Sequence, residues 1–160
     1  MKKVVSLVLV ALMAVAVLAG CGSDPLYDDL SNYLNVEMVE VNANYENLKA
    51  ELAKWESFED DAALATNISD AVLPIVNDSL KKLEAINPAT EEVKAVKAKY
   101  VSMMEEYKKG FEALLEGCNT QEDEIIATAY ASIEKAVSLL DEYNKALEEL
   151  AAECGTEVEY

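Results

Sequence analysis

Residues 121–153 read QEDEIIATAYASIEKAVSLLDEYNKALEELAAE, and this stretch carries the clearest helical pattern in the chain. Apolar residues recur in it every seven positions, in two series offset by three. The two series are Ile126, Ile133, Leu140 and Leu147, and Ala129, Ala136, Tyr143 and Leu150. Alternating steps of three and four place both series on one face of an α-helix. The stretch therefore predicts a long amphipathic helix over residues 121–153 that packs on other helices through this face.

A comparable stripe over residues 26–58 predicts the first helix, with Asp24 as its N-cap and Pro25 at its first position. The stripe consists of Tyr27, Leu34, Val41, Leu48 and Trp55, together with Ser31, Met38, Tyr45 and Leu52. Five asparagines accompany it, and asparagine is a poor helix former. They predict a helix that is not fully regular. Solvated faces explain these asparagines, and a polar binding groove is the alternative.

The second predicted helix covers residues 62–86 and contains a proline at its centre. Pro74 lacks a backbone N–H and clashes with the preceding turn, so we expect the second helix to be kinked or split there. Packing explains such a kink, and a kink that lines a ligand cavity is the alternative reading.

The third predicted helix starts with Asn87 as its cap and Pro88 in its first turn, and it runs to about residue 116. Gly110 lies inside it and would permit close contact with a neighbouring helix. Gly117 is expected to end it, and Thr120 to start the fourth helix.

These four segments are joined by short connections, which places neighbouring helices antiparallel. The predicted fold is all-α: an up-down-up-down four-helix bundle of long amphipathic helices over residues 26–155. Gly155 ends the last helix, and residues 156–160 form a tail. A three-helix bundle with a detached first helix is the alternative, but the first stripe is too apolar to remain exposed to water.

Composition excludes several classes of function. The chain carries 31 acidic residues against 13 basic ones, all of them lysine, and its net charge of −18 argues against nucleic-acid binding. It has no histidine, which zinc sites and Ser-His-Asp triads require, so we expect no enzyme activity, no metal and no cofactor. Glu59, Asp60 and Asp61 could hold a cation, but they lack the spacing of a calcium loop. These acidic residues are explained instead by the favourable interaction of negative charge with the N-terminus of the following helix.

The N-terminus has the three parts of an export signal. Lys2 and Lys3 are followed by an apolar run over residues 4–18, and then by Leu-Ala-Gly-Cys at residues 18–21. Leu-Ala-Gly-Cys resembles the lipobox of bacterial lipoproteins. The resemblance implies removal of residues 1–20 and lipidation of Cys21, with residues 21–25 as a short tether. An uncleaved transmembrane anchor is the alternative.

The resemblance also implies an exported protein held by acyl chains, palmitate among them. It would lie on the outer face of the bacterial cytoplasmic membrane, or on the outer membrane if the cell has one. We expect a non-enzymatic interaction or scaffolding module, with a cationic envelope protein as partner. The alternative is a small-ligand-binding bundle with a site near Pro74. Such a site would use the inward tyrosines and methionines, which core packing also explains: Met38, Tyr45, Tyr100, Met103, Met104 and Tyr107.

Two further cysteines flank the last predicted helix. A continuous helix between Cys118 and Cys154 would be about 50 Å long, whereas a disulfide needs Cα atoms closer than about 7 Å. We expect no bond between them within one chain. A bridge between chains, and with it the oligomeric state, stays open.

Overall fold

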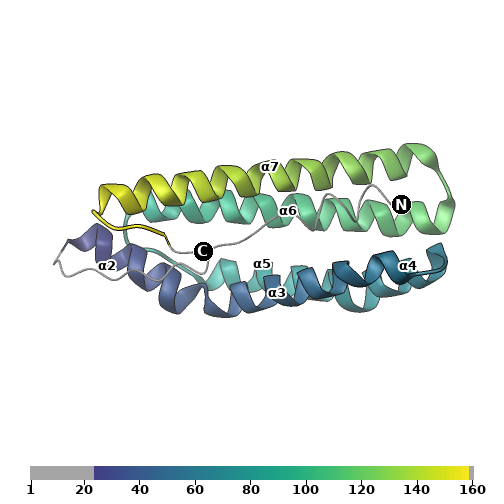
Figure 1. Ribbon diagram of the computed structural model, residues 1–160, viewed down its shortest axis with the longest axis horizontal. Helices are drawn as coiled ribbons and strands as arrows, with labels where there is room; N and C mark the ends of the chain where they lie inside the picture. Colours follow the sequence, from purple (N-terminus) through teal and green to yellow (C-terminus); the bar gives the residue numbers. More distant parts are fainter. Residues whose placement is uncertain (1–23, 159–160) are drawn as a thin grey trace.

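The computed structural model describes residues 24–158, and all regular structure in this part of the chain is helical. Long helices pack side by side into an elongated helical bundle (Figure 1). The elements, in chain order, are α2 (Pro25–Asn32), the π-helical turn η1 (Tyr33–Glu37), α3 (Val39–Ala53), the 3-10 turn η2 (Lys54–Ser57), α4 (Asp61–Asn67), the π-helical turn η3 (Ile68–Val72), α5 (Leu73–Ala85), α6 (Glu91–Thr120) and α7 (Asp123–Glu153). The predictions for residues 1–20, for lipidation at Cys21 and for residues 159–160 lie outside the described residues.

The predicted first helix forms over residues 25–57, here called the first arm. The Asp24 carboxylate accepts a hydrogen bond from the Leu26 N–H at 3.0 Å, and Pro25 opens the helix, as expected. In η1 the Met38 N–H donates to the carbonyl of Tyr33 at 2.9 Å, five residues back. The first arm is therefore helical but irregular.

The π-helical turn η1 changes which residues of the first arm are buried. One extra residue in a turn rotates the helix face by about 100°. In α2 the buried residue is Leu30, and Tyr33, the first residue of η1, is buried as well, whereas Ser31, which the seven-residue pattern placed in the core, is only half-buried. The predicted stripe is correct from Leu34 onward.

The second arm, residues 61–85, stays helical through Pro74 but changes its hydrogen-bonding pattern just before it. In η3 the Leu73 N–H donates to the carbonyl of Ile68, five residues back. Pro74 follows directly as the second residue of α5, and it has no N–H to donate to the turn before it. The helix is therefore neither divided at Pro74 nor regular there, because the π-helical turn absorbs the misfit.

The start of α6 differs from the prediction. Thr90 is the N-cap, and its hydroxyl accepts from the Val93 N–H at 3.4 Å. Asp29 of the first arm accepts hydrogen bonds from the backbone N–H groups of Ala89 and Thr90, at 2.9 Å and 2.8 Å. These bonds hold the loop extended up to Thr90, so α6 begins after Thr90 and the prediction of Asn87 as its cap was wrong.

The end of α6 also differs. Gly117 does not end the helix, because it is buried inside α6, which continues through Thr120. The left-handed residue that ends α6 is Gln121, with φ 61°. Its N–H donates to the Gly117 carbonyl at 2.9 Å, and α7 begins after Glu122 rather than at Thr120.

Glycines bring α6 and α7 into close antiparallel contact. A Cβ on Gly110 would lie 2.7 Å from Cγ1 of Ile133, and one on Gly117 would lie 2.6 Å from Cγ1 of Ile126. Gly110 thus faces Ile133 and Gly117 faces Ile126 in the same antiparallel register of α6 and α7. The contact between the rings of Tyr100 and Tyr143 lies in this register as well. The close contact expected of Gly110 is confirmed.

The end of α7 follows the prediction. Gly155 has φ 70°, and its N–H donates to Ala152 while the Thr156 N–H reaches the Ala151 carbonyl. This pair of bonds is the Schellman arrangement that ends many helices. In the tail, Val158 packs on the core, so the described part of the tail is not loose.

Candidate functional site

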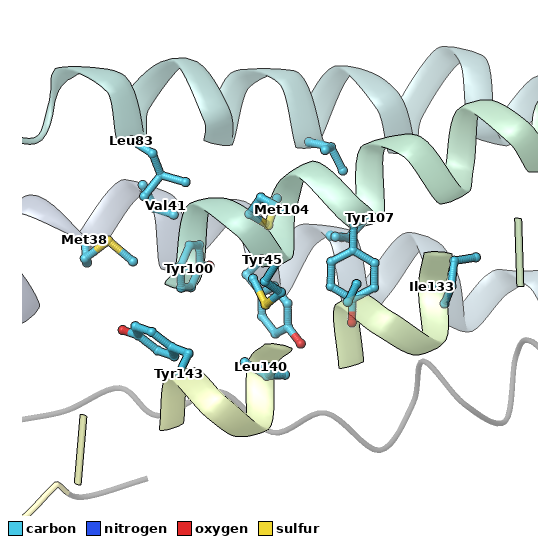
Figure 2. Close-up of a cluster of buried hydrophobic side chains, with 14 of the residues drawn as sticks. Met38, Val41, Tyr45, Leu83, Tyr100, Met104, Tyr107, Ile133, Leu140 and Tyr143 are labelled. Carbon is cyan, nitrogen blue, oxygen red and sulfur yellow. The ribbon is translucent and has the colours of Figure 1, made fainter. Parts of the chain in front are cut away.

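Five tyrosines meet inside the bundle, and we call them the tyrosine cluster. They come from three different parts of the chain: Tyr33 and Tyr45 from the first arm, Tyr100 and Tyr107 from α6, and Tyr143 from α7. Each is at least 95 % buried. Figure 2 shows Tyr45, Tyr100, Tyr107 and Tyr143 among aliphatic and methionine side chains.

The rings of the cluster pack directly on other aromatic rings. Tyr100 and Tyr143 meet edge to face, with centroids 5.1 Å apart. Tyr107 stacks on Phe111 at 5.6 Å, and Trp55 meets Phe111 edge to face at 5.8 Å. Such arrangements are the favoured geometries of packed aromatic side chains.

The methionines predicted to accompany these tyrosines are also buried. Met38 and Met103 have no exposed surface, and Met104 is 1 % exposed. Methionine adapts its shape to irregular gaps between rings. The inward tyrosines and methionines named as a possible ligand site therefore serve as core.

Burial sets the protonation of the cluster. Burial raises the pKa of Tyr107 to about 12, although a hydrogen bond from Tyr45 opposes this rise. Burial likewise raises the pKa of Tyr100 well above its ordinary value. The Tyr100 hydroxyl has no hydrogen-bond partner among the described residues. At neutral pH these phenols stay protonated, so they do not act as bases.

The acidic residues singled out between the first two helices have structural roles. Asp60 caps α4 by accepting from the Ala63 N–H at 2.8 Å. Asp61, the first residue of α4, accepts from the Gln121 side chain at 3.1 Å, which ties the start of α4 to the loop before α7. Within residues 24–158 no three His, Cys, Asp or Glu residues are grouped so that they could hold a metal ion.

The loop before α4 and the loop before α7 form an end of the bundle that is rich in carboxylates, here called the acidic tip. Seven of its eight acidic residues are exposed: Glu56, Glu59, Asp60, Glu116, Glu122, Asp123 and Glu124, with Asp61 half-buried. The nearest lysine in sequence, Lys54, is already paired with Glu51 at 2.6 Å. Figure 1 shows this end, where α4 begins and α6 turns into α7, opposite the end that carries α2.

A groove of about 640 Å³ runs between α5 and α6, and we call it the lysine groove. Its lining combines four lysines, three glutamates, an asparagine and an apolar floor. The residues are Lys81, Lys97, Lys108 and Lys109, then Glu84, Glu105 and Glu112, then Asn77, and finally Leu80, Leu83 and Val101.

Sequence reasoning missed the lysine groove. The available signal was a local excess of lysine: five of the 13 lysines fall within residues 94–109. That excess does not show which of these lysines face α5, because the positions of Lys97 and Lys108 relative to α5 depend on how the two helices pack.

Both described cysteines are free and half-buried. Burial and the nearby Asp61 carboxylate raise the pKa of the Cys118 thiol, and burial raises that of Cys154. Thiols that are protonated at neutral pH are poor nucleophiles. Cys118 lies in the last turn of α6 rather than in the expected turn, and the continuous α7 separates it from Cys154.

Comparisons with protein-family models, with curated proteins and with solved structures each find no match to this chain. Among the described helices, none is both long enough and apolar enough to span a bilayer.

Proposed function

We propose that this protein is an exported lipoprotein, anchored through a lipid on Cys21, that acts as a non-enzymatic interaction module. Its partner would be a cationic envelope protein, met by the acidic tip. The observation that carries the proposal is the acidic tip itself. It lies at one end of the bundle, whereas Asp24, which follows Cys21 by three residues, lies at the opposite end.

The proposal includes the up-down-up-down arrangement of the four helical segments. Two contacts support it at the anchored end: Asp29 bonds Thr90, and the charge of Asp24 acts on Cys154 at the end of α7. At the other end Gln121 bonds Asp61. Helices that return to the same end after each short connection are antiparallel to their neighbours.

Anchoring at residue 21 would direct the acidic tip away from the membrane. The 31 residues of α7 span about 46 Å at about 1.5 Å per residue. Loss of Lys2 and Lys3 with the signal would bring the net charge from −18 to −20. Anionic headgroups repel such a surface, which favours a bundle that extends outward.

The anchor is tested by replacing Cys21 with serine. We expect C21S to retain residues 1–20 and to lose the mass of the lipid, because serine has no thiol to form the thioether. Membrane fractionation and intact mass measure both effects. A C21S protein that is cleaved and stays membrane-bound as before would refute lipidation.

The partner is tested by capture from the protein's own membranes. In the tip variant, Glu56, Glu59, Asp123 and Glu124 become glutamine or asparagine. The matched control makes the same change at four exposed acids of α7: Glu134, Asp141, Glu149 and Glu153. We expect the tip variant to lose a protein that the parent and the control both capture, and added salt to weaken capture. Equal capture by all three proteins would refute the acidic tip as the contact surface.

Small-ligand binding is the second candidate function, and one observation favours it. The lysine groove begins at Asn77, about one turn after Pro74, which is the region that the sequence indicated. The groove lies between α5 and α6, however, and not among the tyrosines of the core.

A further inference from the structure

We propose that the lysine groove binds a small organic anion that carries more than one carboxylate or phosphate group. The inference develops the second candidate function and does not depend on the acidic tip or on the lipid anchor.

The first reason is the distribution of charge. The described residues contain eleven lysines, of which four line the groove, and 30 acidic residues, of which three line it. This leaves seven lysines and 27 acidic residues elsewhere. The groove is therefore a place where cations outnumber anions on a strongly acidic protein.

The second reason is that the groove lysines are poorly neutralised. Lys108 lies 3.8 Å from Glu112, and Lys109 lies 3.9 Å from Glu106. Among the described residues, Lys81 forms no direct ion pair or hydrogen bond, although its charge acts on the carboxylate of Asp78, which Lys82 already pairs at 2.6 Å. By contrast, five of the seven other lysines have a carboxylate within 2.9 Å: Lys49, Lys54, Lys82, Lys94 and Lys135.

The third reason is that one of these cations is fixed in place. The ammonium group of Lys97 donates to the carbonyl of Ile86, just after the end of α5. A carbonyl at a helix end favours a positive charge but does not neutralise it. Lys97 thus presents a charge that is held in position at one end of the groove, and Lys108 and Lys109 lie eleven and twelve residues further along α6.

The volume and the lining fit a small ligand. Ligand pockets occupy about 300–1,000 Å³, and the groove lies within this range at about 640 Å³. Leu80 and Val101 are half-buried and form an apolar floor that the carbon skeleton of an organic anion would cover, with the fully buried Leu83 beside them. Glu84, Glu105 and Glu112 oppose binding, so more than one acidic group is needed to engage several lysines at once.

The net charge of the protein does not prevent this binding. Charges on the solvated surface are screened beyond about 8 Å at physiological ionic strength. The anion would respond mainly to the groups that line the groove, where lysine is in excess.

The test is isothermal titration calorimetry on the full chain in a nonionic detergent, with citrate and pyrophosphate as probes. Citrate binding with no pyrophosphate binding would indicate a carboxylate ligand, and the reverse a phosphate ligand. Either result supports the proposal. The groove variant Lys81→Gln/Lys109→Gln should bind the probe about tenfold more weakly than the parent.

Two further variants make the result specific to the groove. Lys54→Gln/Lys145→Gln removes the same charge at exposed positions outside it and should leave the affinity unchanged. Glu105→Gln should strengthen binding, because it removes an opposing charge from the lining. Absence of binding by both probes, or equal weakening by the groove and control variants, would overturn the proposal. Neither outcome would affect the acidic tip.

Discussion

Replacing Gly110 with alanine tests how closely α6 and α7 approach each other. In an exposed helix this change would stabilise the protein by about 1 kcal/mol, because glycine is the poorer helix former. At Gly110 the new Cβ would lie 2.7 Å from Cγ1 of Ile133 and 3.2 Å from the Ala129 carbonyl oxygen and the Ile133 nitrogen. Two of these three neighbours are backbone atoms and cannot rotate away.

The expected result is a net destabilisation. Overpacking of a core costs about 1–3 kcal/mol, and contact with rigid backbone places Gly110 in the upper part of that range. Subtracting the helix-propensity gain of about 1 kcal/mol leaves G110A about 1–2 kcal/mol less stable than the parent. Urea denaturation followed by circular dichroism measures this difference.

Gly117 and an exposed alanine serve as internal comparisons. A Cβ on Gly117 would lie 2.6 Å from Cγ1 of Ile126, which is only half-buried and has more room to shift than the buried Ile133, while the nearest backbone atom is 3.4 Å away. G117A should therefore cost less than G110A. Ala131→Gly, on the exposed face of α7, should lower the free energy of unfolding by about 1 kcal/mol, and it measures the difference in helix propensity between alanine and glycine in this protein. A G110A protein more stable than the parent by about 1 kcal/mol would show that the two helices are not in contact there.

Three other predictions concern hydrogen bonds, buried phenols and thiols. Burial raises the pKa of Asp29, but its bonds from Thr90 and Ala89 outweigh this and leave the pKa below its ordinary value. The hydrogen bonds to Asp29 therefore stabilise the fold at pH values above the pKa of Asp29 in the unfolded chain, and this stabilisation is lost as the pH falls through its lower pKa in the folded protein. Asp29→Asn should lower the free energy of unfolding, measured by urea denaturation, by about 1–2 kcal/mol at pH 7 and by less in acid. A cost independent of pH would contradict this. Tyr100→Phe removes an unpartnered buried hydroxyl and should leave stability unchanged or higher, whereas Tyr107→Phe leaves Tyr45 without its acceptor and should cost about 1 kcal/mol in the same assay. A Tyr100→Phe variant less stable than Tyr107→Phe would contradict the conclusion that the Tyr107 hydroxyl has a hydrogen-bond partner and the Tyr100 hydroxyl has none. Intact mass under non-reducing conditions should show no Cys118–Cys154 bond, and such a bond would mean that α7 is broken.

Helical structure was predictable from the sequence because the information is local. The seven-residue series in residues 121–153 depends only on the rise and turn of a single helix, and α7 forms where the series predicted it. Asp24, Pro25 and Gly155 were likewise predictable, since a cap or a helix stop acts on its own turn.

Other features depend on contacts between segments that are distant in the sequence. Gly117 looked like a helix stop, but Ile126 of α7 packs on it and α6 continues. Thr90 rather than Asn87 caps α6 because Asp29, about 60 residues earlier, holds the loop. A local pattern contains no information about such partners.

The sequence alone determined the helical class, the positions of the long amphipathic stripes, the acidic charge and the lipobox-like start of the chain. Tertiary structure decided the rotation of the stripe at η1, the burial of Tyr33, and the meeting of Lys81 with Lys97, Lys108 and Lys109 in one groove. The physical reason is that periodicity places residues on one face of their own helix. The relative position of two faces depends on how all the side chains between them pack.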